Sequence, residues 1–167
     1  MALKVNVSHE FPVSVERYIE IFFDPQYVEY LEQNAGVEQY RIESLQRSET
    51  HIARTVKVVP KVELPGWMKK ALRSKRIAYL ETMSHELGSS KLKQTILSSV
   101  LPERIQINAV IELEPKGTDR CVRHCEVDIS VKILGFGSRI EEQLVGTFKK
   151  GFADGVAHMA AFDERAG

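Results

Sequence analysis

Three charged residues, Arg54, Glu81 and Arg123, stand where an alternating apolar pattern places an inward-facing side chain. In a strand, residues two positions apart point to the same face, and the neighbours at that spacing are apolar in all three cases. An isolated buried charge is very costly, so we expect these residues to be paired, solvated or turned outward by a bulge. Three such positions favour a polar spot in an apolar cavity. Arg54 and Arg123 would anchor a lipid head group or carboxylate there, and Glu81 would orient one of them.

The C-terminal segment has helical spacing but contains glycine in its interior, at Gly146, Gly151 and Gly155. Each glycine costs a helix about 0.8–1.0 kcal/mol relative to alanine. One interpretation is close packing of the helix on a sheet. The other is that the missing side chains leave room for a ligand beside Phe148 and Phe152, which belong to the apolar stripe of the same helix.

A local excess of positive charge lies between residues 61 and 76, with six basic residues and one acid. Trp67 and Met68 group on one side of a short predicted helix, and with Tyr79 they are candidates to line the cavity. Three basic side chains surround the apolar pair: Lys69, Lys70 and Arg73. A basic amphipathic helix with an aromatic residue can rest on an anionic bilayer. Trp67 and Met68 would then enter the interface, and Lys69, Lys70 and Arg73 would contact the anionic lipids. The alternative is an ordinary solvated face on a helix that covers the core.

Motifs that would identify an enzyme or a metal site are absent from the sequence. It contains no GxSxG elbow, no HExxH and no Walker loop, and its five histidines are scattered. Cys121 and Cys125 lie about 13 Å apart on a regular strand, which is beyond disulfide reach, and His124 points to the opposite face. We therefore expect buried reduced thiols, no metal and no cofactor.

Composition indicates one domain spanning residues 1–167. Hydrophobic residues make up 43% and charged residues 28%, as in ordinary globular proteins. The 23 basic and 23 acidic residues give a net charge of zero, which argues against a general nucleic-acid binder. No apolar run is long enough to span a bilayer, and the N-terminus lacks the apolar block of a signal peptide. We expect a cytoplasmic protein.

Hydrophobic periodicity predicts the elements that position these residues. Residues 3–8 alternate as a strand, Ser14 and Asp24-Pro25 begin two short helices, and alternation returns from residue 37 to residue 131 in about six strands. Short connections favour an antiparallel meander. A capping box at Ser138 to Glu141 then begins a helix of about 28 residues, or about 42 Å.

A curved sheet wrapped around one long helix is the compact way to bury all these apolar faces. This α+β order resembles the helix-grip fold of the START-like (SRPBCC) superfamily, which includes Bet v 1-type proteins and polyketide cyclases. The prediction is six to seven antiparallel strands around a C-terminal helix, with two short helices after the first strand. The resemblance implies a ligand site between the sheet and the long helix.

A narrower resemblance begins at the proline-led segment Leu64–Lys70 and extends to the region from Phe136 to Phe162. Both are similar to PRELI-type phospholipid-transfer proteins, whose members work between mitochondrial membranes, although we expect no transit peptide in this chain. The closer match would be an uncharacterised bacterial family of the START-like group.

Three functions remain open from the sequence. The first is non-enzymatic binding, or transport, of a hydrophobic or amphipathic small molecule such as a lipid, with transient contact to anionic membranes and no nucleic acid. The second is an enzyme of the polyketide cyclase or dehydrase kind that uses Glu81 and His158 as acid and base. The third is a protein-interaction module of the co-chaperone kind, in which the fold is only a scaffold.

Overall fold

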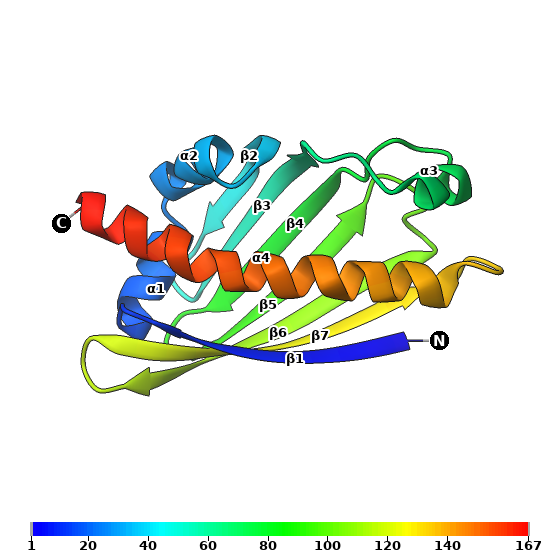
Figure 1. The fold of residues 1–167 in the computed structure, drawn as a ribbon. Helices are drawn as coiled ribbons and strands as arrows, with labels where there is room; N and C mark the ends of the chain where they lie inside the picture. Colours follow the sequence, from blue (N-terminus) through cyan, green and yellow to red (C-terminus); the bar gives the residue numbers. More distant parts are fainter. Residues whose placement is uncertain (1, 167) are drawn as a thin grey trace.

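A computed structural model describes residues 2–166, which form a seven-stranded antiparallel sheet, three short helices and one long C-terminal helix (Figure 1). The strands are β1 (Ala2–Phe11), β2 (Val37–Arg47), β3 (His51–Pro60), β4 (Tyr79–Glu86), β5 (Lys91–Ser98), β6 (Ile105–Lys116) and β7 (Arg120–Val131). The helices are α1 (Val15–Phe22), α2 (Pro25–Asn34), α3 (Gly66–Leu72) and α4 (Gly137–Ala166). The predicted α+β helix-grip architecture is confirmed.

The sheet is a meander closed by the first strand. Its order is β1-β7-β6-β5-β4-β3-β2, so β2 to β7 pair with their neighbours in sequence and β1 pairs antiparallel with β7. Buried and exposed residues alternate along β5, where Leu92, Gln94 and Ile96 face inward. The sheet curves, and α4 crosses its inner face (Figure 1). This alternation therefore decides which side chains meet beneath α4.

Two helices turn the chain at one end of the sheet, and both begin where the sequence predicts. The Ser14 hydroxyl accepts a hydrogen bond from the Arg17 amide at 3.1 Å, which caps α1. The Asp24 carboxylate accepts one from the Gln26 amide at 2.9 Å, and Pro25 occupies the first turn of α2. These caps hold the aromatic side chains of α1 and α2 against the inner face of the sheet.

The long helix begins one residue before the predicted cap. At Gly137 an added Cβ would lie 2.5 Å from the Val131 carbonyl oxygen, so only glycine allows this close approach of the chain to β7. The prediction of a capping box at Ser138 is wrong, because this residue lies inside α4. The Glu141 carboxylate is instead buried and accepts a hydrogen bond from the Val131 amide at 2.9 Å. It thereby fastens the first turn of α4 to the end of β7.

The core divides into two apolar clusters, one toward each end of α4. The first joins α1, α2 and the C-terminal end of α4, and includes Phe11, Tyr18 and Phe162. The second joins α3 and the N-terminal end of α4, and includes Met68 and Ile140. Within residues 2–166, no helix has both the length and the apolar character needed to cross a membrane.

Candidate functional site

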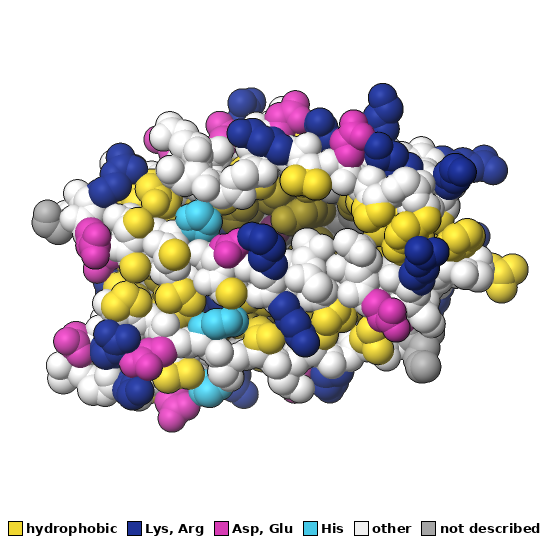
Figure 2. Space-filling view, in the orientation of Figure 1, with side chains coloured by type: hydrophobic (Ala, Val, Ile, Leu, Met, Phe, Trp, Pro, Cys, Tyr) yellow, Lys and Arg dark blue, Asp and Glu magenta, His cyan; other side chains and the backbone are white. Residues whose placement is uncertain are grey.

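A cavity of about 460 Å³ lies between α4 and the inner face of the sheet. Space-filling atoms show the molecule hollowed beside α4, with hydrophobic side chains at the bottom of the hollow (Figure 2). The loop between β3 and α3 lines the cavity opposite α4, with Val62, Leu64 and Pro65. The sheet contributes mostly aliphatic and aromatic side chains from its inner face. The cavity lies between the sheet and the long helix, where the family resemblance implies a ligand site.

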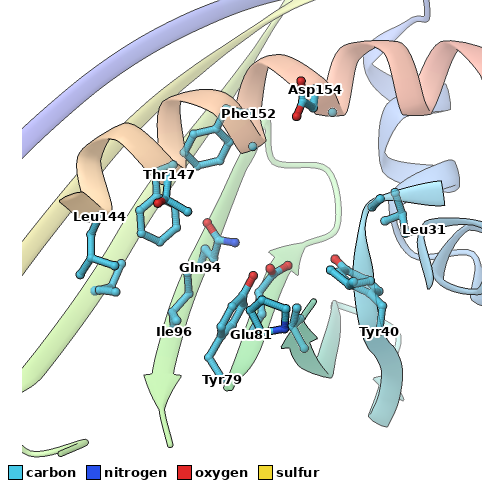
Figure 3. Close-up of a pocket in the computed structure, with 18 of the residues that line it drawn as sticks. Leu31, Tyr40, Tyr79, Glu81, Gln94, Ile96, Leu144, Thr147, Phe152 and Asp154 are labelled. Atoms are coloured by element: carbon cyan, nitrogen blue, oxygen red, sulfur yellow. The ribbon is translucent and has the colours of Figure 1, made fainter. Parts of the chain in front are cut away.

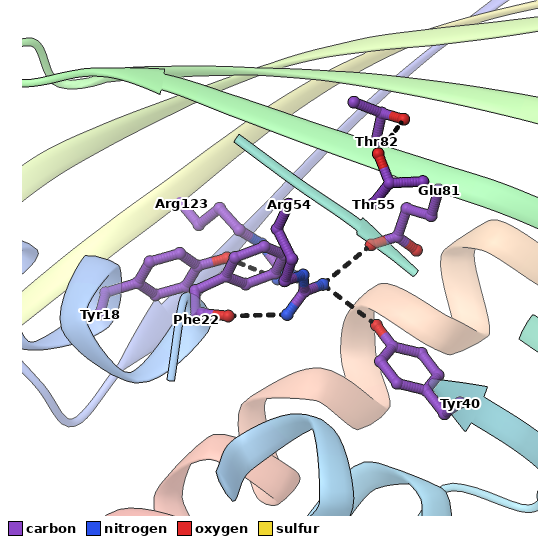
Figure 4. Close-up of polar contacts among 8 residues, drawn as sticks. All are labelled: Tyr18, Phe22, Tyr40, Arg54, Thr55, Glu81, Thr82 and Arg123. Atoms are coloured by element: carbon purple, nitrogen blue, oxygen red, sulfur yellow. Dashed lines mark hydrogen bonds and ion pairs between the residues drawn. The ribbon is translucent and has the colours of Figure 1, made fainter. Parts of the chain in front are cut away.

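Arg54 and Glu81 form an ion pair at one end of this cavity (Figure 4). Glu81 on β4 stands opposite Val56 on β3, so Arg54 is its diagonal neighbour on the same face of the sheet. Arg54 Nη2 lies 3.3 Å from Glu81 Oε1. Glu81 is thus paired with an arginine, as the sequence analysis expects of a buried charge.

Arg54 itself does not line the cavity, which corrects its assignment as a direct ligand anchor. Its side chain is fully buried, Nη1 donates to the Phe22 carbonyl at 2.7 Å and Nη2 also reaches the Tyr40 hydroxyl at 3.4 Å. Its guanidinium lies 4.0 Å from the centre of the Phe22 ring. Arg54 therefore supports the cavity wall and joins α1, β2 and β4 to one another.

Three polar side chains from β4 and β5, Tyr79, Glu81 and Gln94, point into the cavity beneath α4 (Figure 3). We call them the polar end. Burial raises the pKa of the Glu81 carboxyl above its usual value, and the nearby Arg54 and Gln94 oppose this only in part. Burial and the neighbouring Glu81 also raise the pKa of the Tyr79 phenol, which therefore stays protonated at neutral pH.

Arg123 on β7 lines the cavity and is held by neutral groups. Its Nη2 donates to the Phe152 carbonyl at 2.8 Å and its Nη1 to the Tyr18 hydroxyl at 3.4 Å. The guanidinium lies 4.7 Å from the Phe11 ring centre and 5.1 Å from that of Phe152. No carboxylate in residues 2–166 forms an ion pair with it. Cation–π contacts and a helix carbonyl therefore stabilise this buried charge.

The residues predicted on α4 line the cavity together, and the two glycines differ in what they allow. A Cβ added at Gly151 would meet no atom within 4 Å, whereas one at Gly155 would lie 3.7 Å from Arg123 Nη1. Phe148 and Phe152 contribute their rings to the same wall. Gly151 therefore leaves open space in the cavity, and Gly155 accommodates Arg123.

Helix α3 turns its apolar side toward the core. Met68 is 1% exposed and lines the cavity, so the expectation that it enters a membrane is wrong. Trp67 does not line the cavity, which corrects its assignment as a ligand contact. The Arg139 guanidinium lies 4.0 Å from its ring centre. Lys69 forms an ion pair with Glu63, whereas Lys70 and Arg73 are exposed.

Sequence reasoning missed Gln94 and two aromatic residues that line the cavity, Phe22 of α1 and Tyr40 of β2. Gln94 lies between Leu92 and Ile96 on one strand face, which is the same signal that identified Glu81. No pattern pointed to Tyr40 or Phe22, because an aromatic residue in an apolar series reads as ordinary core. The predicted buried thiols at Cys121 and Cys125 are confirmed. Across the described part of the chain, no three His, Cys, Asp or Glu side chains form a metal-binding group.

Residues 6–161 match the family described as "Protein of unknown function (DUF2505)". The chain belongs to this family. No protein of curated function matches this DUF2505 member significantly.

Solved structures show which fold this DUF2505 member shares. It is similar to the Zhui aromatase/cyclase from Streptomyces sp. R1128, with a TM-score of 0.67, 9% identity and coverage of 99% of this chain and 95% of that one. A START superfamily protein from Mycobacterium smegmatis has a TM-score of 0.56 and 13% identity, with coverage of 93% of this chain and 98% of that one. Truncated norcoclaurine synthase from Thalictrum flavum has a TM-score of 0.62 and 16% identity, with coverage of 96% of this chain and 94% of that one. At these identities the likeness shows the START-like helix-grip fold alone.

Proposed function

We propose that this DUF2505 protein binds a hydrophobic or amphipathic small molecule, such as a lipid, without transforming it. The observation that supports the proposal is the cavity of about 460 Å³ between α4 and the sheet. Pockets for small molecules commonly measure about 300–1,000 Å³ and combine apolar walls with a few polar groups. Here the polar end supplies those groups, and the aliphatic and aromatic walls favour an apolar ligand body. One structure of the same fold, norcoclaurine synthase from Thalictrum flavum, is in complex with dopamine and hydroxybenzaldehyde, which supports small-molecule binding by this fold.

The test is recovery of the ligand from the purified protein. We expect native mass spectrometry to show a bound species, and solvent extraction to release an organic molecule. The neutral fluorescent probe N-phenyl-1-naphthylamine should bind the emptied protein and be displaced by that molecule. Gly151→Leu should weaken probe binding because its side chain enters open cavity space. Gly146→Leu is the matched control, since Gly146 also lies on α4, is exposed and does not line the cavity. A protein that carries no ligand and binds no probe would contradict the proposal.

A second candidate function is catalysis of the cyclase or dehydrase kind in the same cavity. The raised pKa of Glu81 favours it, because a carboxyl group that titrates nearer to neutral pH can act as general acid or base. His158 also lines the cavity and could exchange protons with a bound molecule. If the extracted ligand is a reactive ketide or aldehyde that the protein converts, and Glu81→Gln abolishes the conversion, the enzyme is the correct assignment.

We also propose that the end of the molecule that carries α3 touches anionic membranes during ligand exchange. The loop between β7 and α4 lies at the same end as α3 (Figure 1). It exposes Leu134 at 98% and Phe136 at 39%. Two basic side chains of the α3 region, Lys70 and Arg73, are exposed as well. Apolar side chains flanked by basic ones are what an anionic interface attracts.

A further inference from the structure

We infer that the polar end, Tyr79, Glu81 and Gln94, binds the ligand through a hydroxyl or amino group that donates hydrogen bonds. The inference rests on the proposed function and names the ligand class: an amphipathic alcohol, phenol or amine. The sequence analysis expected Arg54 to anchor an acidic head group of the ligand. We infer instead that the ligand donates hydrogen bonds to acceptor oxygens on β4 and β5. The argument depends on which hydrogen-bonding groups remain unpaired around the cavity.

The unpaired oxygens at the polar end are acceptors, although two nearby donors, Arg54 Nε and Arg123 Nε, are also buried without a partner. Arg54 engages Glu81 Oε1, and the other carboxylate oxygen, Oε2, has no hydrogen-bond donor among the described residues. Gln94 Oε1 is buried and also lacks a partner. A buried acceptor without a partner costs free energy, so its presence in a cavity wall indicates a missing donor. The terminal torsion of glutamine is broad, so a small rotation presents this oxygen to a ligand.

The terminal guanidinium nitrogens around the polar end are already paired, whereas Arg54 Nε and Arg123 Nε are buried donors without a partner. Arg54 does not line the cavity, and the Arg123 guanidinium packs against the Phe11 and Phe152 rings. Arg54 Nη1 donates to the Phe22 carbonyl, and Nη2 serves Glu81 and Tyr40. Both terminal nitrogens of Arg123 also donate hydrogen bonds, Nη2 to the Phe152 carbonyl and Nη1 to the Tyr18 hydroxyl. The Tyr79 hydroxyl, which stays protonated, can donate or accept at this end, and the Gln94 amide nitrogen is a further donor close to Glu81. An incoming carboxylate would face the Glu81 oxygen and the Gln94 carbonyl, whereas an incoming hydroxyl or amine would satisfy them.

The position of the polar end suits an amphipathic molecule. Glu81 faces Ile96 across the sheet, and Gln94 faces Met83, so two acceptors lie among apolar neighbours on the inner face. Figure 3 shows the side chains of Tyr79, Glu81 and Gln94 below α4, with Leu144 and Phe152 on the helix side. A ligand can therefore place its polar group on β4 and β5 while its apolar body contacts α4.

The test compares three naphthalenes of nearly equal size by calorimetry: 2-naphthol, which donates a hydrogen bond, 2-methoxynaphthalene, which does not, and 2-naphthoate, which is an anion. We expect the emptied protein to bind 2-naphthol about tenfold more tightly than the methyl ether. Gln94→Met should remove most of this preference by weakening 2-naphthol binding, with little effect on the ether. The matched control is Gln143→Met, since Gln143 lines the cavity from α4, and this variant should keep the preference.

Each outcome decides between the two proposals. Equal binding of 2-naphthol and its ether overturns the donor site but supports the apolar cavity. Tighter binding of 2-naphthoate than of 2-naphthol also overturns it and assigns the site to an anion beside Arg123. If none of the three binds, the cavity proposal fails and the donor site fails with it. The wild-type comparison does not depend on the folding of any variant.

Discussion

At the scale of single residues, the two inward-facing arginines stabilise the fold through contacts that their sequence context does not reveal. Arg54 supports the wall through Phe22, Tyr40 and Glu81, and Arg123 is held by a helix carbonyl and aromatic rings. The alternation in each strand predicts that these side chains face inward, and that prediction is confirmed by their burial. Their partners come from α1, β2 and α4, which lie far away in sequence, so no local pattern could have named them.

We predict that Arg54→Met acts on stability more than on ligand choice. The change leaves the Glu81 carboxylate buried without its counter-ion and two acceptors without their donor. Removing one partner of a buried ion pair costs about 3–5 kcal/mol. Urea unfolding of the variant should show a loss of this size. A loss below about 1 kcal/mol, the typical value for an exposed pair, would contradict the structural role.

Glu81 should also give stability a specific pH dependence. Its folded-state pKa is raised by burial, so between its usual value near 4.5 and the raised value the folded state holds a proton that the unfolded state has released. The contribution of Glu81 to the free energy of unfolding must therefore fall as pH rises through that window. Subtracting the curve of Glu81→Gln from that of the wild type isolates this slope. A flat difference would show that Arg54 cancels the effect of burial, and one that rises with pH would show that Arg54 outweighs it.

At the scale of elements, sequence predicts the helices and strands well because their signals are local. Ser14 and Asp24 begin α1 and α2 as expected, since a cap is made within three residues. The face that α3 turns inward was not predictable, because Trp67 and Met68 are both apolar and only packing decides between them. Met68 enters the cavity wall, while Trp67 stacks with Arg139 at the start of α4.

The two interior glycines of α4 should respond differently to the same substitution. Gly151→Ala should stabilise the protein by about 0.8–1.0 kcal/mol, because alanine favours the helix and its methyl group meets no atom within 4 Å. Gly155→Leu should destabilise it, since the side chain must displace the Arg123 guanidinium. Thermal unfolding of both variants beside Gly146→Ala and Gly146→Leu separates helix propensity from packing. Equal responses at positions 151 and 155 would contradict the distinction between open space and close packing.

At the scale of the whole molecule, the sequence correctly predicted how the strands and short helices are arranged around the long helix. A curved sheet must cover its inner face, and a helix of 30 residues is the element long enough to do so. The size of the remaining cavity was not predictable, because it depends on how far α4 stands from the sheet at Gly151 and Phe152. The charge balance around the opening likewise follows from three-dimensional placement, since Lys69 is neutralised by Glu63 while Lys70 and Arg73 remain exposed.

The proposed membrane contact at the α3 end depends on the β7–α4 loop together with two basic side chains, Lys70 and Arg73. We predict that vesicle binding rises with the content of anionic lipid and weakens as salt shortens the Debye length below about 8 Å. Leu134→Glu should abolish binding because it places a like charge where an apolar side chain would insert. Lys70→Gln with Arg73→Gln should weaken binding by roughly 2 kcal/mol, or about thirtyfold, since each basic residue contributes about 1 kcal/mol near such a surface.

Vesicle cosedimentation measures these effects, and Leu87→Glu is the matched control, because Leu87 is exposed to 43% and lies just beyond β4 in another loop. All variants should melt within a degree or two of the wild type, since the substituted side chains are exposed. Wild-type binding that does not change with anionic lipid would remove the electrostatic part of the proposal. Equal losses for Leu134→Glu and Leu87→Glu would show that added negative charge anywhere repels the membrane, and that the β7–α4 loop has no special part in docking.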